Sequence, residues 1–192
     1  MPHLTGPQIL DPAQAIQALR LVRLAVESWA RNGLRIAGAP PADSFSQVRC
    51  PVFVTLSLSG RLRGCVGSLE AHVHLGESLV DCALGAAFRD SRFPPIAASD
   101  LPLLAYEISL LTQPQALEDP ASVVVGVDGL LAEIAGRRGL LLPQVAAQQG
   151  WDRETFLDQT CLKAGAKAGD WRRDCRLWVF QAQILSEEDP TA

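Results

Sequence analysis

Apolar and polar residues alternate along residues 52–58 and 104–111, which predicts two strands that each bury one face. Ser59-Gly60 supplies a tight turn after the first strand, so we expect residues 61–68 to return beside it as an antiparallel partner. A closing strand is expected at residues 178–184, where the alternation recurs.

Apolar positions spaced by 3.6 residues predict a first helix, with an N-cap at Asp11 before a proline and a stop at Gly33. Its apolar positions are Ile16, Leu19, Val22, Val26 and Trp29. Residues 75–88 are apolar nearly all round, which is typical of a buried helix. Two shorter helices are expected at residues 143–150 and 152–165, each ended by a glycine.

Two turn signals lie between the second strand and the third helix. Asp128-Gly129 stands between apolar runs and predicts a hairpin turn, and residues 137–139 predict the next turn. These elements together favour an α+β fold, with an antiparallel β-sheet flanked by helices.

The composition is that of an ordinary globular protein, with 48% hydrophobic and 20% charged residues in a chain of 192. A net charge of −4 argues against a dedicated nucleic-acid-binding protein, which usually carries a basic excess. No apolar run reaches the roughly 18 residues of a membrane span, and the N-terminus does not resemble a secretory signal. The five cysteines form no C-x-x-C pair, so we expect free thiols and a cytoplasmic protein.

The candidate chemistry is concentrated just after the first strand, where a thiol, two guanidinium groups and two glycines are close in sequence. In an extended segment Arg63 shares a face with Cys65 and Gly67, opposite to Leu62 and Val66. A neighbouring cation favours the nucleophilic thiolate, so Cys65 is a candidate catalytic residue. The alternative is that Cys65 is a small core residue, the commonest fate of a free cysteine.

Further residues near this stretch are candidates for substrate binding. Gly64 and Gly67 allow other atoms to approach the backbone closely. Asp90 and Arg92 either contact a ligand or brace each other as an ion pair. Glu107 lies in the middle of the second predicted strand, on its less apolar face, where it is either a solvated residue or a carboxylate that faces a pocket.

The histidines His72 and His74 follow the thiol, and His72 is a further candidate for substrate binding. Together with Cys65 and Cys82 they match no standard zinc spacing, so we expect no metal and no cofactor. The chain also lacks the sequence motifs of serine hydrolases, phosphate-binding loops and dinucleotide-binding folds.

The stretch at residues 62–68 resembles a signature of the proteins named for the human Alport, midface hypoplasia and elliptocytosis chromosomal region (AMMECR). Their bacterial and archaeal versions are called AmmeMemoRadiSam system protein A. Further matches follow in family order: Asp90-Ser91-Arg92-Phe93-Pro94-Pro95, Glu107-Ile108-Ser109-Leu110-Leu111, Gly126-Val127-Asp128-Gly129-Leu130, Leu142-Pro143-Gln144-Val145 and Cys161-Leu162-Lys163-Ala164-Gly165.

The resemblance implies one AMMECR-like domain over residues 12–184, an α+β fold with a larger and a smaller subdomain. Residues 1–11 and 185–192 are then expected to be frayed termini. The resemblance also implies two partners, a Memo-like protein, itself similar to extradiol dioxygenases, and a radical SAM protein.

Two departures from the family pattern weaken any ligand contact at those places. Relatives often carry Arg-Pro-Leu where this chain has Val73-His74-Leu75. They often carry Leu-Pro-Pro where it has Ala166-Lys167-Ala168.

Three functions compete. The first is an enzyme or enzyme subunit for a small molecule, in which Arg63 stabilises the Cys65 thiolate or holds an anionic substrate group. The second is a non-catalytic scaffold that assembles the Memo-like and radical SAM partners. The third, which the acidic total disfavours, is nucleic-acid binding through the arginines at positions 61, 63, 89, 92, 137 and 138.

Overall fold

The computed structural model describes residues 7–38, 45, 47–69 and 71–187. The chain divides into two compact units. Among the described residues, the large unit comprises residues 8–110 and 184–187, and the small unit comprises residues 7 and 111–183. Helices and antiparallel strands together give the predicted α+β fold.

The first helix, α1 (Pro12–Asn32), begins and ends as predicted. The Asp11 carboxylate accepts the backbone N–H of Gln14, whose side chain accepts the N–H of Asp11 in return, which satisfies two N–H groups at the helix start. The predicted buried face is wrong in part: Ile16 is 52% exposed, and the face turned to the core is Ala18, Val22, Ala25 and Val26.

The sheet of the large unit has the strand order β2-β1-β3. Strand β1 (Val52–Leu58) pairs antiparallel with β2 (Arg61–Ser68) on one side and with β3 (Leu104–Leu111) on the other. Ser59 and Gly60 both have positive φ, as a two-residue hairpin turn requires. β3 buries both faces except at Glu107, so the prediction of a one-sided strand is wrong there.

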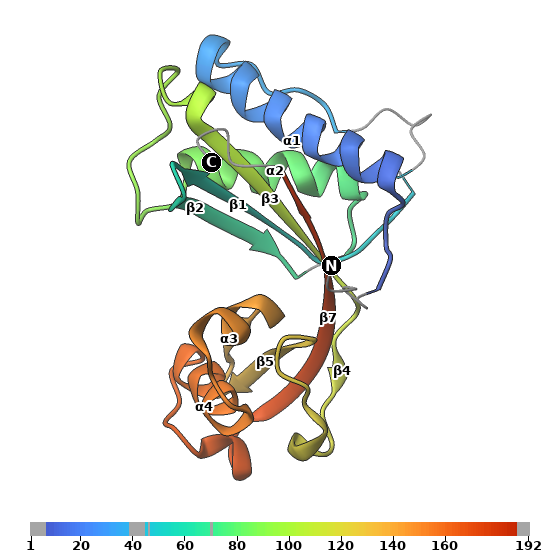
Figure 1. Cartoon of the computed structure of the whole chain (residues 1–192), viewed down its shortest axis with the longest axis vertical. Helices are drawn as coiled ribbons and strands as arrows, with labels where there is room; N and C mark the ends of the chain where they lie inside the picture. Colours follow the sequence, from blue (N-terminus) through green and yellow to red (C-terminus); the bar gives the residue numbers. More distant parts are fainter. Residues whose placement is uncertain (1–6, 39–44, 46, 70, 188–192) are drawn as a thin grey trace. The chain divides into compact units, whose positions relative to one another are not determined.

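Helix α2 (Leu75–Phe88) lies with α1 over one face of this sheet (Figure 1). As predicted, it is buried nearly all round. Close approach depends on a glycine of β2, because a Cβ on Gly64 would lie 2.0 Å from the carbonyl oxygen of Ala86. The helix backbone therefore rests directly on the strand that carries Cys65.

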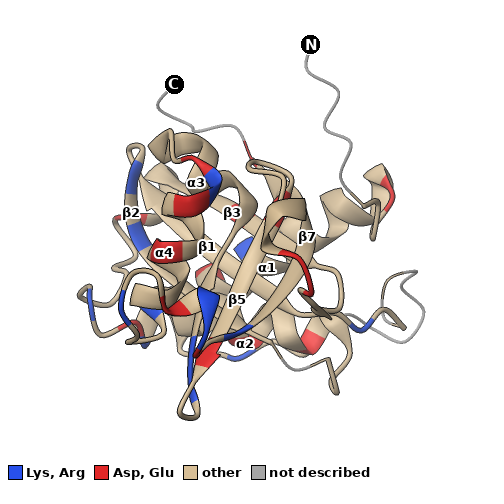
Figure 2. Ribbon diagram, turned by 90° about the horizontal axis from the view of Figure 1, so that it is seen from below, with Lys and Arg blue, Asp and Glu red and all other residues tan. Residues whose placement is uncertain are grey.

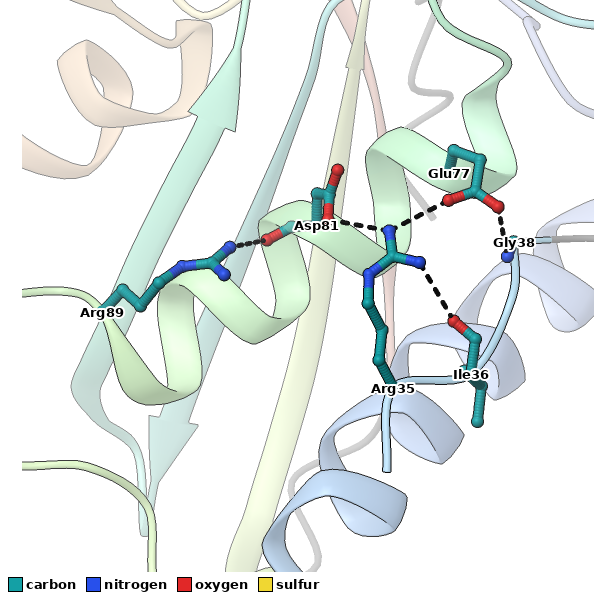
Figure 3. Close-up of polar contacts among 6 residues, drawn as sticks. All are labelled: Arg35, Ile36, Gly38, Glu77, Asp81 and Arg89. Carbon is teal, nitrogen blue, oxygen red and sulfur yellow. Dashed lines mark hydrogen bonds and ion pairs between the residues drawn. The ribbon is translucent and has the colours of Figure 1, made fainter. Parts of the chain in front are cut away.

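A polar network fixes the segment after α1 to the outer side of α2 (Figure 3). The Arg35 guanidinium bridges Glu77 and Asp81 at 3.0 and 2.9 Å, and the second oxygen of Glu77 accepts the backbone N–H of Gly38 at 2.7 Å. Arg89 donates to the Asp81 carbonyl from the end of the helix, at 3.0 Å. These contacts attach residues 35–38 to α2 and bind Arg89, at the end of the helix, back to its middle.

The small unit is a second antiparallel sheet covered by two helices. Its strand order is β4-β7-β5-β6, and the helices are α3 and α4, both close to the predicted ranges. Their apolar side chains form a core separate from that of the large unit. The bounds are β4 (Gln115–Ala116), β5 (Asp128–Ile134), β6 (Arg137–Leu141), α3 (Pro143–Gln149), α4 (Arg153–Lys163) and β7 (Arg176–Ser186).

The hairpin predicted at Asp128-Gly129 is wrong, because both residues lie in β5. The glycine is needed there for packing: a Cβ on Gly129 would meet the Phe180 ring of β7 at 2.4 Å. Asp128 closes the preceding turn by accepting the N–H of Val124 at 2.8 Å. The hairpin turn falls at positions 135 and 136, both with positive φ, so residues 137–139 are strand instead of turn.

Ordered structure extends beyond residues 12–184 at both ends. Leu10 is buried in the core of the large unit. The last residues of β7 belong to the large unit, where β7 neighbours β3. Glu187 donates its N–H to the Tyr106 carbonyl and forms an ion pair with Arg23 at 2.5 Å. The rest of both predicted frayed termini, residues 1–6 and 188–192, lies outside the described residues.

Candidate functional site

Cys65 lies half-buried in β2, directly opposite Thr55 of β1. The Thr55 hydroxyl donates to the Cys65 sulfur at 3.3 Å. On its other side Thr55 pairs with Glu107 of β3. Because directly paired residues share a face and Gly64 faces α2, this row of three lies on the sheet face away from that helix.

The row places a hydroxyl between a thiol and a carboxylate. Neighbouring strands are about 4.8 Å apart, so Glu107 lies roughly 10 Å from Cys65, across Thr55. A small molecule lying over Thr55 would contact both ends of the row.

A register shift in β2 changes the predicted position of Arg63. Leu56 pairs with Gly64, but Ser57 pairs with Leu62, so Arg63 is the extra residue of a β-bulge. The strict alternation used to place Arg63 beside Cys65 therefore fails, and Leu62, on the side of Ser57, does not share a face with Val66. The Arg63 guanidinium instead donates to the Pro95 carbonyl at 3.2 Å.

The loop after α2 clamps the backbone of Cys65 from both ends. The Asp90 carboxylate accepts the Cys65 N–H at 2.9 Å, and Arg92 donates to the Cys65 carbonyl at 3.2 Å. Asp90 and Arg92 also pair with each other at 2.6 Å. The cation held against Cys65 is thus Arg92, a residue 27 positions away in sequence.

The charges of this clamp stabilise each other. Asp90 is 6% exposed and Arg92 is 56% exposed. The hydrogen bond from Arg92, helped by the backbone N–H groups of Cys65 and Arg92, holds the pKa of the Asp90 carboxyl well below its usual range. The same pairing raises the pKa of Arg92. Both groups stay charged through the physiological range.

One nitrogen of the Arg63 guanidinium stays unsatisfied. Its Nη1 atom is buried and has no hydrogen-bond partner among the described residues, while Nη2 binds Pro95. A buried donor left unpaired costs free energy, and a guanidinium is the group that best matches a carboxylate or phosphate. The Nη1 atom of Arg63 is therefore an unsatisfied donor that the protein itself covers.

The two glycines of the stretch do allow close approach, but by atoms of the protein itself. The space beside Gly64 is filled by α2, and the Phe53 ring lies where a Gly67 Cβ would be, at 2.2 Å. The space that these two glycines provide is therefore occupied by α2 and by the Phe53 ring, and is not left for a ligand. Their role is to admit a helix on one face and an aromatic ring on the other.

The histidines lie outside the row. His74 caps α2, and its Nε2 lies 3.4 Å from Nη2 of Arg49; His72 is exposed in the preceding loop. Among the residues that the structure describes, no three His, Cys, Asp or Glu side chains come together as a metal-binding group.

Thr55 was missed by sequence reasoning, although a signal existed. It stands on the polar face of an alternating strand, and the pairing of that strand with residues 61–68 sets it near Cys65. The contacts made by Asp90, Arg92 and Pro95 leave no such signal, because they depend on where the loop after α2 folds back.

The arginines proposed for nucleic acid are divided between the units and mostly bound internally. Arg89 and Arg137 donate to backbone carbonyls, and Arg138 pairs with Glu133. Figure 2 shows basic segments interspersed with acidic ones along the ribbon. No described helix is long and apolar enough to cross a membrane.

Comparisons with known proteins identify relatives across nearly the whole chain. The AMMECR1 family model matches residues 19–185. The chain is 40% identical to a protein of Thermofilum pendens, covering 94% of this chain and 93% of that protein. It is 42% identical to a protein of Methanothermobacter thermautotrophicus, covering 88% and 92%. The crystal structure of an uncharacterised protein of Pyrococcus horikoshii superposes with a TM-score of 0.89, at 34% identity and 95% coverage of both chains.

Proposed function

The chain belongs to the AMMECR1 family, and from this premise we propose that it is a small-molecule enzyme, or a subunit of one, with Cys65 as its nucleophile. The observation that carries the proposal is the hydrogen bond from the Thr55 hydroxyl to the Cys65 sulfur at 3.3 Å. A hydroxyl that donates to sulfur favours the charged thiolate, the form that attacks electrophiles. Arg92 binds the carbonyl of the same residue, but as a neutral pair with Asp90, so the hydroxyl of Thr55 is the group expected to act on the sulfur.

The chemistry follows from these roles. The Cys65 thiolate attacks an electrophilic carbon of the substrate, and a C–S bond forms as the leaving group departs with its bonding electron pair; a second nucleophile then displaces the sulfur and restores the thiolate. In this proposal Arg63 holds an anionic group of the substrate through its Nη1 atom, once the protein groups that cover it move aside, and Glu107 contacts the far end of the substrate over Thr55. Asp90 and Arg92 act as positioning residues, because they fix the backbone of Cys65.

The partners belong to the same proposal. The chain's likeness to AmmeMemoRadiSam system protein A supports a Memo-like protein and a radical SAM protein as the proteins with which it acts. In that arrangement one partner supplies or consumes the electrophile that Cys65 handles. His72, exposed just before α2, is then a candidate for contact with the substrate or with a partner.

The test is the rate of iodoacetamide alkylation against pH, read for each cysteine by peptide mass spectrometry. We expect Cys65 to react at pH 6.5 faster than glutathione, and Thr55→Val to slow that reaction while Thr55→Ser preserves it. Cys65 and Cys82 share the tryptic peptide 64–89, so fragment ions must assign the adduct. Cys65→Ala is the control.

A scaffold function is the second candidate, and the Asp90–Arg92 clamp favours it, because these side chains bind protein backbone instead of pointing to a ligand. Inertness of Cys65 until the protein unfolds would overturn the nucleophile proposal. Capture of the two partners by Cys65→Ala as efficiently as by the wild type would then support the scaffold.

A further inference from the structure

Two thiols of the small unit lie in contact, away from the row at Cys65. The sulfur of Cys161, in the last turns of α4, is 3.3 Å from the sulfur of Cys175, which directly precedes β7. Both are free cysteines. A disulfide bond is about 2.05 Å long, so the two sulfurs are about 1.3 Å from bonding distance.

The connecting loop holds the two thiols together through its own contacts. Asp158 of α4 accepts the Gly169 N–H and the Trp171 indole N–H, both at 2.7 Å. The carbonyl of Asp170 accepts the N–H of Cys175 at 3.1 Å. Cys175 is thereby fixed over the end of α4, so the contact between the sulfurs is part of the folded loop.

The two thiols differ in access, which sets an order of reaction. Cys161 is fully buried at 0% exposure, whereas Cys175 is only half-buried. Burial and the neighbouring sulfur raise the pKa of the Cys161 thiol to about 12. An oxidant from solvent therefore meets Cys175 first, and Cys161 is the partner that resolves the product.

We propose that Cys161 and Cys175 form a reversible redox site, which a hydroperoxide converts to a disulfide. The Cys175 thiol ionises and its thiolate attacks the peroxide oxygen; the O–O bond breaks, Cys175 becomes a sulfenic acid, and the proton lost by the thiol joins the departing hydroxide to form the first water. The Cys161 sulfur then attacks the sulfenic sulfur, the S–S bond forms, and the S–O bond breaks to release the second water. Two thiols are oxidised by two electrons and one hydrogen peroxide is reduced to two waters.

The disulfide joins two segments that the loop at residues 162–174 already brings together. Reduction by another thiol, through thiol–disulfide exchange, restores both cysteines. In a reducing environment the pair rests as two thiols, and it records exposure to peroxide.

The experiment treats the native full chain with one equivalent of hydrogen peroxide, blocks free thiols with N-ethylmaleimide after unfolding, and digests with trypsin without reductant. We expect peptides 154–163 and 174–176 to appear as one disulfide-linked species that dithiothreitol separates. The oxidised protein should also unfold about 5–10 °C higher, because the cross-link restricts the unfolded chain.

Two variants separate the site from the thiol at Cys65. Cys175→Ser removes a half-buried sulfur with little loss of packing, and it should abolish both the linked peptide and the rise in melting temperature. Cys65→Ala should leave both unchanged. Recovery of peptides 154–163 and 174–176 as separate maleimide adducts, at a peroxide dose that oxidises Cys65, would overturn the proposal. Linkage of Cys161 to any other cysteine would overturn it as well.

Discussion

The polar contacts around Cys65 fall on its backbone as much as on its thiol. Asp90 and Arg92 hold the N–H and the carbonyl, while Thr55 alone donates to the sulfur. Residues that fix the strand are thereby distinct from the residue that adjusts the reactivity of the thiol. Substitutions at these positions should separate stability from reactivity.

Thr55→Val should lower the alkylation rate of Cys65 at pH 7 by about threefold to tenfold, because one hydrogen bond of about 1 kcal/mol to the thiolate is lost. The side chain keeps its shape, so the free energy of unfolding should change little. Stopped-flow alkylation and urea unfolding measure the two effects. An unchanged alkylation rate would show that the hydroxyl does not act on the sulfur.

Asp90→Asn should cost about 1–3 kcal/mol of unfolding free energy at pH 7, toward the lower end because Arg92 is half exposed to solvent. The folded-state pKa of Asp90 is depressed, so its contribution is present above the ordinary carboxyl pKa of about 3.9 and disappears as pH falls below it. Urea unfolding at pH 7, 5 and 3 should show the wild type and the variant converging only in acid. A difference in unfolding free energy between the wild type and the variant that grew as the pH fell would contradict this prediction.

At the scale of the elements, glycines set how closely helix and strand approach. β2 lies against the backbone of α2 at Gly64, and a side chain there has no free volume, because the obstacle is a carbonyl group. The same strand carries Cys65. The contact between α2 and β2 therefore also sets the distance of Cys65 from the helix.

Gly64→Ala should destabilise the large unit by about 2–4 kcal/mol, because α2 must move away from β2 to admit the methyl group. Chemical unfolding gives the free energy. Leu62→Ala in the same strand is the matched control: Leu62 is 48% exposed, so its truncation should cost much less. An equal loss of unfolding free energy in the two variants would show that the contact between Gly64 and α2 is not the cause of the destabilisation.

The pattern of neighbouring residues correctly predicted those helices and strands that neighbouring residues alone define. The alternation from Val52 and the cap at Asp11 gave β1 and the start of α1, because one buried face or one capped turn is enough to define each. The hairpin predicted at Asp128-Gly129 was wrong because this glycine does not form a turn. It makes room for the Phe180 ring of the neighbouring strand β7.

In the candidate site, Cys65 and Arg63 were visible in the sequence, but their relation was not. The bulge at Arg63 depends on the pairing register with β1, and the Asp90–Arg92 clamp depends on a loop 25 residues away from Cys65. Likewise, the contact between the Cys161 and Cys175 sulfurs requires the fold of the whole connecting loop. Contacts between residues that are far apart in the sequence do not appear in the pattern of apolar and polar positions.

For the whole molecule, the five cysteines fall into two groups by access. The thiols of Cys50, Cys82 and Cys161 are buried, while those of Cys65 and Cys175 are half-buried. Burial raises the pKa of Cys50 to about 11 and that of Cys82 to about 12. These thiols are therefore neutral over the range in which an unfolded cysteine ionises.

The protein should lose stability as pH rises above about 8.5, where cysteines of the unfolded chain begin to ionise while Cys50 and Cys82 remain protonated. Below that pH the contribution of the raised pKa values is fully present. Thermal unfolding at pH 7, 9 and 10.5 measures the loss. Replacing both cysteines by alanine should flatten this alkaline decline, and an equally steep decline in the double variant would assign it to other groups.

Strand β7 has a consequence for biosynthesis. The ribosome delivers residues 8–110 early, yet the large unit includes residues 184–187, which lie beside β3 and pair Glu187 with Arg23. Until residues 184–187 have been translated, β3 therefore keeps an open edge, the kind of surface on which nascent chains aggregate and chaperones bind. A stop codon directly after Gln183 would leave every candidate site residue in place and still expose that edge.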